Sequence, residues 1–143
     1  MVEKHKVDVD VEVTLRLVVP DAGPVPLPVS LRYVAADPYA VRALFRGGDG
    51  ETSVEWVFAR DLLHEGLDRP SGEGDVQVWP GVADGRDVVL VSLNSPDGHA
   101  VLEADADDLR AFLDRTLALV PAGDEGRYLH VEAELASLFG RAA

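Results

Sequence analysis

Apolar and polar residues alternate along the first part of the chain. Valine and leucine occupy every second position from Val7 to Leu17, and acidic, threonine and arginine side chains fill the positions between. This period of two predicts a half-buried strand over 7–19, which at about 3.3 Å per residue would be roughly 40 Å long. Strands of that length usually bend or twist strongly. The pattern therefore favours crossed or barrel-like antiparallel sheets over a flat sheet.

Six further segments alternate in the same way or form short apolar runs between turn residues. A proline-rich connection, 20–28, precedes the first of them. The turn Ser95–Gly98 is expected to join the last two as a hairpin, because Pro at the second turn position followed by Asp-Gly is a strong turn signal. Pro80 is expected to end the strand that contains Trp79. The predicted strands are 27–34, 39–45, 53–58, 75–79, 87–94 and 99–103.

Helical spacing replaces the strand period at three places. A short helix is predicted over 59–67, and a longer one begins at Asp105 and ends before Pro121. Asp105 is expected to cap that helix, with Asp108 reaching back to it. A last helix is predicted over 128–139. The pattern predicts an α+β fold of crossed antiparallel sheets with one short helix and two C-terminal helices.

Length and composition favour one domain. A chain of 143 residues rarely divides into two cores, so we expect a charged extension over 1–6 followed by a single domain over 7–140. The absence of cysteine excludes disulfide scaffolds, thiol catalysis and cysteine-ligated metals. No apolar run approaches the roughly 18 residues of a membrane span, and no signal peptide is visible, so a cytoplasmic location is expected.

The charge balance is strongly acidic. The chain has 13 Lys and Arg against 26 Asp and Glu, a net charge of -13. A nucleic-acid-binding surface needs clustered basic residues, so nucleic acid is not an expected partner. One patch would escape this argument if the fold brought its members together: Arg16, Arg32, Arg42 and Arg46.

The sequence contains no recognisable catalytic or metal-binding pattern. Its four histidines lie on different predicted elements, and its serines lack the G-x-S-x-G context of a hydrolase. The glycine run 47–50 has no following Lys-Ser/Thr, so it is not a phosphate loop. The acidic face at Asp8, Asp10 and Glu12 is better explained as a solvated strand face than as a cation site. We therefore expect no enzyme activity, no metal and no cofactor, with an unrecognised hydrolase as the least favoured alternative.

A protein that works by contact should present apolar anchors rimmed by charge. The segment 59–79 is the best candidate, because a short helix and the loop 70–74 would combine a fixed platform with an adaptable edge. Arg60 and Asp61, the two charged residues at the start of the helix, are expected to point outward. The alternatives are that the leucines only close the core, or that the acidic face of the helix starting at Asp105 binds the partner. The predicted partner-binding residues are Arg60, Asp61, Leu62, Leu63, Leu67 and Trp79.

Three stretches carry a family resemblance. The segment Glu55–Pro80, reading EWVFARDLLHEGLDRPSGEGDVQVWP, resembles the SsgA-like proteins of sporulating actinobacteria, most of all their SsgB branch. Leu31–Tyr39 (LRYVAADPY) and the turn Ser95–Gly98 fit the same family, and the resemblance spans about 7–140. It implies a non-enzymatic developmental protein at the cell septum that recruits the tubulin-like FtsZ with SsgA-type helpers. Its association with the membrane would be indirect.

The resemblance also implies a fold and an assembly. The family fold is similar to the Whirly proteins, with crossed antiparallel sheets and terminal helices assembled as a trimer. Uncovered sheet edges and apolar helix stripes independently favour a homo-oligomer. The alternative function is Whirly-like binding of single-stranded nucleic acid, against which the charge of -13 argues.

Overall fold

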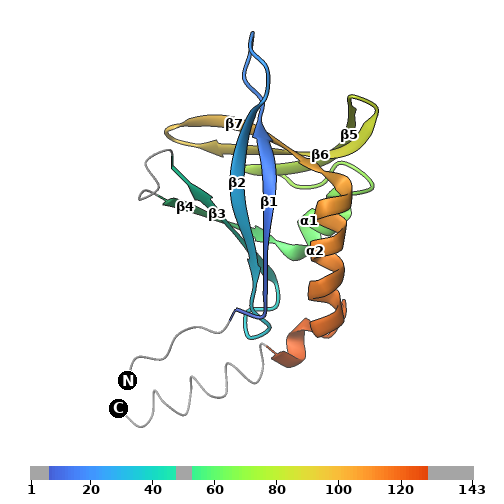
Figure 1. Ribbon diagram of the computed structural model, residues 1–143. Coiled ribbons are helices and arrows are strands. Elements are labelled where there is room, and N and C mark those ends of the chain that lie inside the picture. The colour runs from blue at the N-terminus through green and yellow to red at the C-terminus, as the bar shows by residue number, and fades with distance from the viewer. Residues whose placement is uncertain (1–6, 48–52, 129–143) are drawn as a thin grey trace, which may run out of the picture.

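One curled antiparallel sheet and the helices packed on it make up the fold (Figure 1). The computed structural model describes residues 7–47 and 53–128. The strand order across the sheet is β4-β3-β2-β1-β7-β6-β5. The elements in chain order are β1 (Val9–Leu17), β2 (Val25–Tyr33), β3 (Ala40–Arg46), β4 (Ser53–Ala59), α1 (Arg60–Gly66), β5 (Val76–Ala83), β6 (Arg86–Ser95), β7 (Gly98–Asp105) and α2 (Ala106–Leu119).

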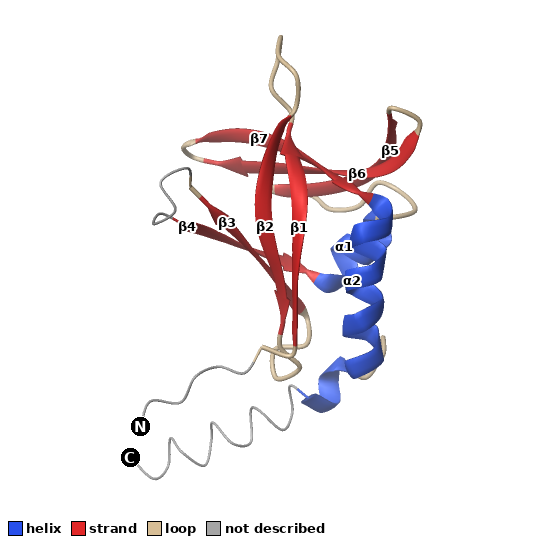
Figure 2. Ribbon diagram, in the orientation of Figure 1, coloured by secondary structure: helices blue, strands red, loops and turns tan. Residues whose placement is uncertain are grey.

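The curl arises where the two halves of the sheet meet. β1 pairs with β2 along its whole length but with β7 only at Arg16 and Leu17. The β5–β7 half therefore turns away and crosses the β1–β4 half, and α2 lies beside β1 in the angle between them (Figure 2). The predicted crossed antiparallel arrangement is confirmed, in the form of a single seven-stranded sheet.

The strand register gathers the apolar positions on one face. Val11 lies opposite Leu31, which lies opposite Ala43, and Ala43 lies opposite Trp56. α2 covers this face with its buried stripe, and full burial of one such large apolar side chain stabilises the fold by about 1.5–3 kcal/mol. The stripe consists of Ala106, Leu109, Phe112, Leu113 and Thr116.

Prolines lie inside two strands, where the sequence predicted a connection and a strand end. β2 includes Pro26 and Pro28, because β3 pairs with β2 only from Val29 onward and leaves that side of β2 open. β5 continues through Pro80 to Ala83, so the predicted stop at Pro80 is wrong. An edge strand tolerates proline, since a missing N–H on its free side breaks no ladder bond.

The helices also differ from prediction in one detail. Asp105 occupies the N-cap position of α2 but makes no side-chain capping bond, so the predicted capping by Asp105 and Asp108 is wrong. The Asp105 carboxylate instead accepts hydrogen bonds from Arg16 and Arg86. No helix within 7–47 and 53–128 is long and apolar enough to cross a membrane.

Some predicted features lie outside the described residues. They are the extension 1–6, the glycine positions 48–50 and all but the first residue of the predicted last helix. Within the described part, the chain is helical over 125–128.

Candidate functional site

Arg60 begins α1 and is buried, so the expectation that it points outward is wrong. The residue is 1% exposed. Its Nη2 donates to the Glu125 carboxylate at 2.8 Å, and its Nη1 donates to the carbonyl of Thr116 at 3.2 Å. The guanidinium carbon also lies 5.2 Å from the centre of the Tyr33 ring. Arg60 therefore links β2, α1 and the chain that follows α2.

The surroundings of this ion pair favour the charged form of Glu125. Hydrogen bonding from Arg60 is the main cause that holds the pKa of Glu125 below its ordinary value, with backbone hydrogen bonds adding to it. The backbone N–H of Gly123 donates to the second carboxylate oxygen at 2.8 Å. Burial raises the pKa of Tyr33 to about 12, and its hydroxyl donates to the carbonyl of Pro38. Arg60 thus has a structural role.

The other predicted binding residues divide between core and surface. Leu63 and Leu67 belong to the hydrophobic core, as the alternative interpretation of the leucine stripe supposed. Asp61 is exposed, and Leu62 is half-buried against the core. Trp79 is half-buried on the outer face of β5, opposite Leu90 of β6.

A hollow lies beside Trp79, between the end of α1, the following loop and β5. Two backbone hydrogen bonds between Ser71 and Val78, at 2.8 and 2.9 Å, hold the loop against the free edge of β5. Gly72 has a φ of +96°, and a Cβ there would lie 2.5 Å from the carbonyl oxygen of Val76, so the loop needs glycine at this position. The hollow is open to solvent, has a volume of about 560 Å³ and is lined by Glu65, Pro70, Ser71, Gly72, Glu73, Gln77, Val78 and Trp79.

The chemistry of the hollow combines one indole with two carboxylates. Glu73 is exposed, and the one ion pair of Glu65 with a described residue is long, 3.6 Å, to the exposed Arg69. Such a pair contributes little to stability, so both carboxylates are available to a partner. The hollow suits binding of a protein segment with an apolar side chain and cationic neighbours. The hollow lies within the segment 59–79 that the sequence singled out, but its shape was not predicted, because it depends on the pairing of Ser71 with β5.

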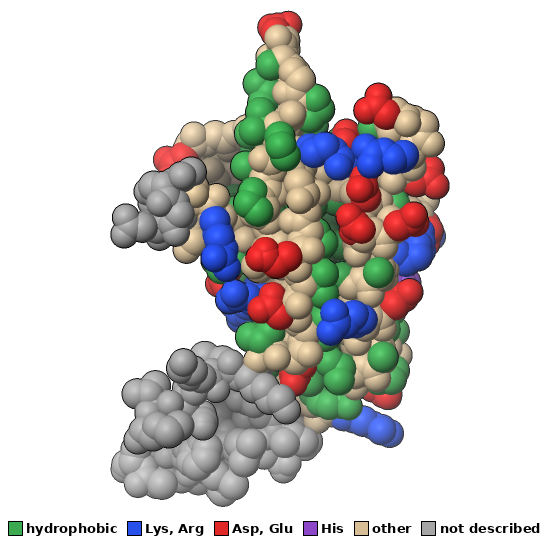
Figure 3. Space-filling model, viewed as in Figure 1, with side chains coloured by type: hydrophobic (Ala, Val, Ile, Leu, Met, Phe, Trp, Pro, Cys, Tyr) green, Lys and Arg blue, Asp and Glu red, His purple; other side chains and the backbone are tan. Residues whose placement is uncertain are grey.

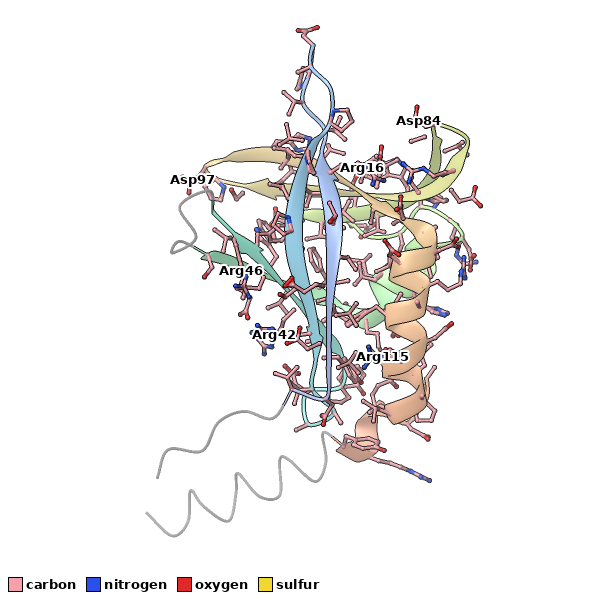
Figure 4. All side chains as sticks on the ribbon, viewed as in Figure 1. Arg16, Arg42, Arg46, Asp84, Asp97 and Arg115 are labelled. Carbon is pink, nitrogen blue, oxygen red and sulfur yellow. The ribbon has the colours of Figure 1, made fainter. Side chains whose placement is uncertain are left out.

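The predicted arginine patch does not form as a unit of four. Arg16 lies where β1 crosses β7, and it donates to Glu103 at 2.6 Å and to Asp105 at 2.8 Å (Figure 4). The hydrogen bond to Glu103 is the main cause that raises the pKa of Arg16, and the hydrogen bond to Asp105 adds to it. Arg42 on β3 pairs with two carboxylates, and Arg32 lies 3.5 Å from Asp10. Most of the local positive charge is therefore already neutralised.

Acidic and basic side chains are interspersed over α2 and the crossing of β1 and β7 (Figure 3). Asp107, Asp108 and Asp114 are exposed on α2, but so are Arg110 and Arg115, so the alternative binding face on this helix is mixed in charge and stays a prediction. Among the described residues, no group of three or more His, Asp or Glu side chains is placed to hold a metal ion.

Comparison with known proteins gives consistent results. The family model for the Streptomyces sporulation and cell division protein SsgA matches residues 27–125. The sporulation-specific cell division protein SsgB of Kineococcus radiotolerans is 56% identical over 136 residues, covering 94% of this chain and 81% of that protein. SsgB of Streptomyces coelicolor is 54% identical over 130 residues, covering 91% and 94% respectively.

Solved structures show the same fold. An SsgA-like sporulation-specific cell division protein from Thermobifida fusca superposes with a TM-score of 0.85 at 45% identity, covering 96% of this chain and 98% of that one. A structure reported with SsgB mutations that correlate with longitudinal cell division in Streptomyces coelicolor gives 0.82 at 53% identity, covering 89% of this chain and all of that one. The relatives support a developmental role in cell division. The chain belongs to the SsgA family of sporulation and cell division proteins.

Proposed function

We propose that this protein is a non-enzymatic adaptor that helps to position the division septum during sporulation by recruiting FtsZ. The observation that carries the proposal is the match to sporulation-specific cell division proteins along nearly the whole chain. On this proposal the protein acts on the cytoplasmic side of the septum together with SsgA-type proteins, and reaches the membrane indirectly.

The hollow beside Trp79 is the proposed recruitment surface. A half-buried indole is a typical anchor, because a few aromatic residues usually supply most of the binding energy of an interface. Glu65 and Glu73 at its rim would steer and orient a basic segment of the partner. The loop between α1 and β5 is held by hydrogen bonds to Val78, so little ordering entropy is lost on binding. Of the residues predicted from the sequence, Trp79 lines the hollow, whereas Asp61 and Leu62 lie on α1 outside its lining and stay predicted partner contacts.

Co-sedimentation of the purified chain with FtsZ polymers tests this proposal. The Glu65→Arg/Glu73→Arg double variant is expected to bind at least about tenfold more weakly, a loss of about 1.4 kcal/mol. Glu12→Arg/Asp97→Arg is the matched control, because it makes the same change in net charge at two exposed positions outside the hollow and outside α2.

The control variant is expected to bind FtsZ like the wild type. Equal losses in both double variants would show that net charge, and not the hollow, controls binding. Absence of binding by the wild-type chain would contradict direct recruitment.

A further inference from the structure

The two edge strands of the sheet, β5 and β4, differ in how their free sides are protected. β5 has Pro80 in the strand, and the Ser71 bridge covers part of its free side. β4, at the opposite margin (Figure 1), pairs with β3 along all seven residues, and no described residue pairs with its other side. It has no proline or lysine. Natural proteins usually protect an exposed edge by such devices, so an unprotected one marks a place where another chain adds.

One hydrogen bond at the end of β4 shows which of its main-chain N–H and C=O groups face β3 and which face outward. The N–H of Arg60, directly after β4, donates to the carbonyl of Tyr39 on the β3 side at 2.7 Å. Successive residues of a strand direct their main-chain groups to opposite sides, so the even-numbered residues of β4 bond to β3. The residues whose N–H and C=O groups point outward are Ser53, Glu55, Val57 and Ala59.

Apolar side chains flank this edge on both faces of the sheet. Val54 is 51% exposed on the inner face, where Trp56 and Phe58 stack with ring centres 6.5 Å apart. Val57 is 49% exposed on the outer face. An added strand would cover both valines.

β3, the strand next to β4, carries positive charge on the outer face of the sheet. Arg42 and Arg46 project from β3 beside β4 (Figure 4). Arg42 already pairs with Asp37 and Glu55, whereas Arg46 has no ion-pair partner among the described residues. Arg46 is exposed and lies opposite Ser53, a small and exposed residue of β4. In a chain of net charge -13, this corner suits an acidic partner.

We propose that the β4 edge binds an extended segment of a protein partner as an eighth strand, with acidic side chains toward Arg46 and apolar ones toward Trp56. Main-chain pairing supplies affinity in such strand addition, and alternate side chains supply specificity. The β4 edge is separate from the hollow beside Trp79, so this proposal does not depend on the proposed function.

Two other occupants fit the edge less well. A single seven-residue edge offers much less contact than the roughly 1,200 Å² of a stable dimer, which disfavours a second copy. Single-stranded nucleic acid would need several free cations and exposed stacking rings. Arg46 is the one outer-face arginine without a carboxylate partner among the described residues, and Phe58 is buried.

A fluorescein-labelled peptide of sequence GDVDVEVDG is the probe, and fluorescence anisotropy gives its affinity for the full chain. Val57→Pro removes one outward N–H without breaking a bond to β3, whereas Val57→Thr keeps that N–H and is the matched control. The proline variant is expected to bind about fivefold more weakly, since one net hydrogen bond contributes roughly 1 kcal/mol. Arg46→Glu is expected to weaken binding about tenfold, while Arg110→Glu, at an exposed position on α2, leaves it unchanged.

Hydrogen exchange supplies a readout that does not depend on the proline variant folding. Peptide binding by the wild type is expected to slow amide exchange at Glu55 and Val57. No peptide binding, or unchanged exchange at β4, overturns the proposal. Tighter binding of a single-stranded oligonucleotide that Arg46→Glu abolishes would assign the edge to nucleic acid, and self-association lost in Val57→Pro would assign it to a second copy.

Discussion

Neutralising Glu125 should destabilise the fold more than any exposed charge change. Glu125→Gln removes the charge opposite Nη2 of Arg60. Arg60 is 1% exposed, and its Nε has no hydrogen-bond partner among the described residues, so its charge would stay buried without compensation. Removing one partner of a buried ion pair usually costs about 3–5 kcal/mol. The lower end applies here, because Glu125 is 6% exposed and glutamine still offers an acceptor. We expect a loss of about 3 kcal/mol, or about 10 °C in Tm.

The pH dependence gives this prediction a second readout. The folded-state pKa of Glu125 lies below its ordinary value of 4.5, so its contribution to stability is complete above that pH and is lost as the pH falls through the folded pKa. Urea unfolding should therefore show the full difference between wild type and Glu125→Gln at pH 7. The difference should shrink progressively below about pH 4.5.

Two controls separate the ion pair from general damage. Asp124→Asn changes the neighbouring carboxylate, which has no ion pair among the described residues, and should alter stability by less than about 0.5 kcal/mol. Replacing both partners, Arg60→Met with Glu125→Leu, should recover most of the loss because no buried charge remains unpaired. A loss under about 1 kcal/mol at pH 7, or a difference that does not vary with pH, would refute the role assigned to the pair.

Three further outcomes are expected. Gly66→Ala should cost about 1–3 kcal/mol in urea unfolding, because a Cβ would lie 2.2 Å from Cγ1 of Val78, and a neutral result would contradict this close packing of α1 on β5. Light scattering should give a homo-oligomer, with a trimer favoured, and a constant mass near 15.4 kDa at micromolar concentrations would rule this out. Gel-shift assays at physiological salt should show no binding of single-stranded DNA or RNA, since the net charge is -13; a salt-sensitive shift at micromolar protein would favour the Whirly-like alternative.

Much of the fold could be predicted because one face of nearly every element is buried. Strict alternation in β1 follows from its core face, and the change of period at Arg60 correctly located α1. The prediction failed at Pro80, because a sequence does not show that a strand lies at a sheet edge. It failed at Asp105 because the competing partner, Arg16, is 89 residues away.

The candidate site was predicted only in part for the same reason. An arginine at the start of a short helix is usually exposed, and nothing near Arg60 in the sequence indicates a carboxylate 65 residues later. Asp61 is exposed as expected, and no described residue forms an ion pair that would remove it from water. The hollow beside Trp79 depends on a bridge between Ser71 and Val78, which becomes visible only in the folded chain.

Time-lapse imaging of sporulating cells tests the adaptor proposal most directly. A fluorescent fusion of this chain would replace the resident SsgB in an actinobacterium that also expresses labelled FtsZ. The proposal predicts that the fusion reaches future septum sites before FtsZ, and that Glu65→Arg/Glu73→Arg leaves FtsZ unrecruited at those sites. FtsZ rings that form first, or that form normally in cells without the protein, would contradict it.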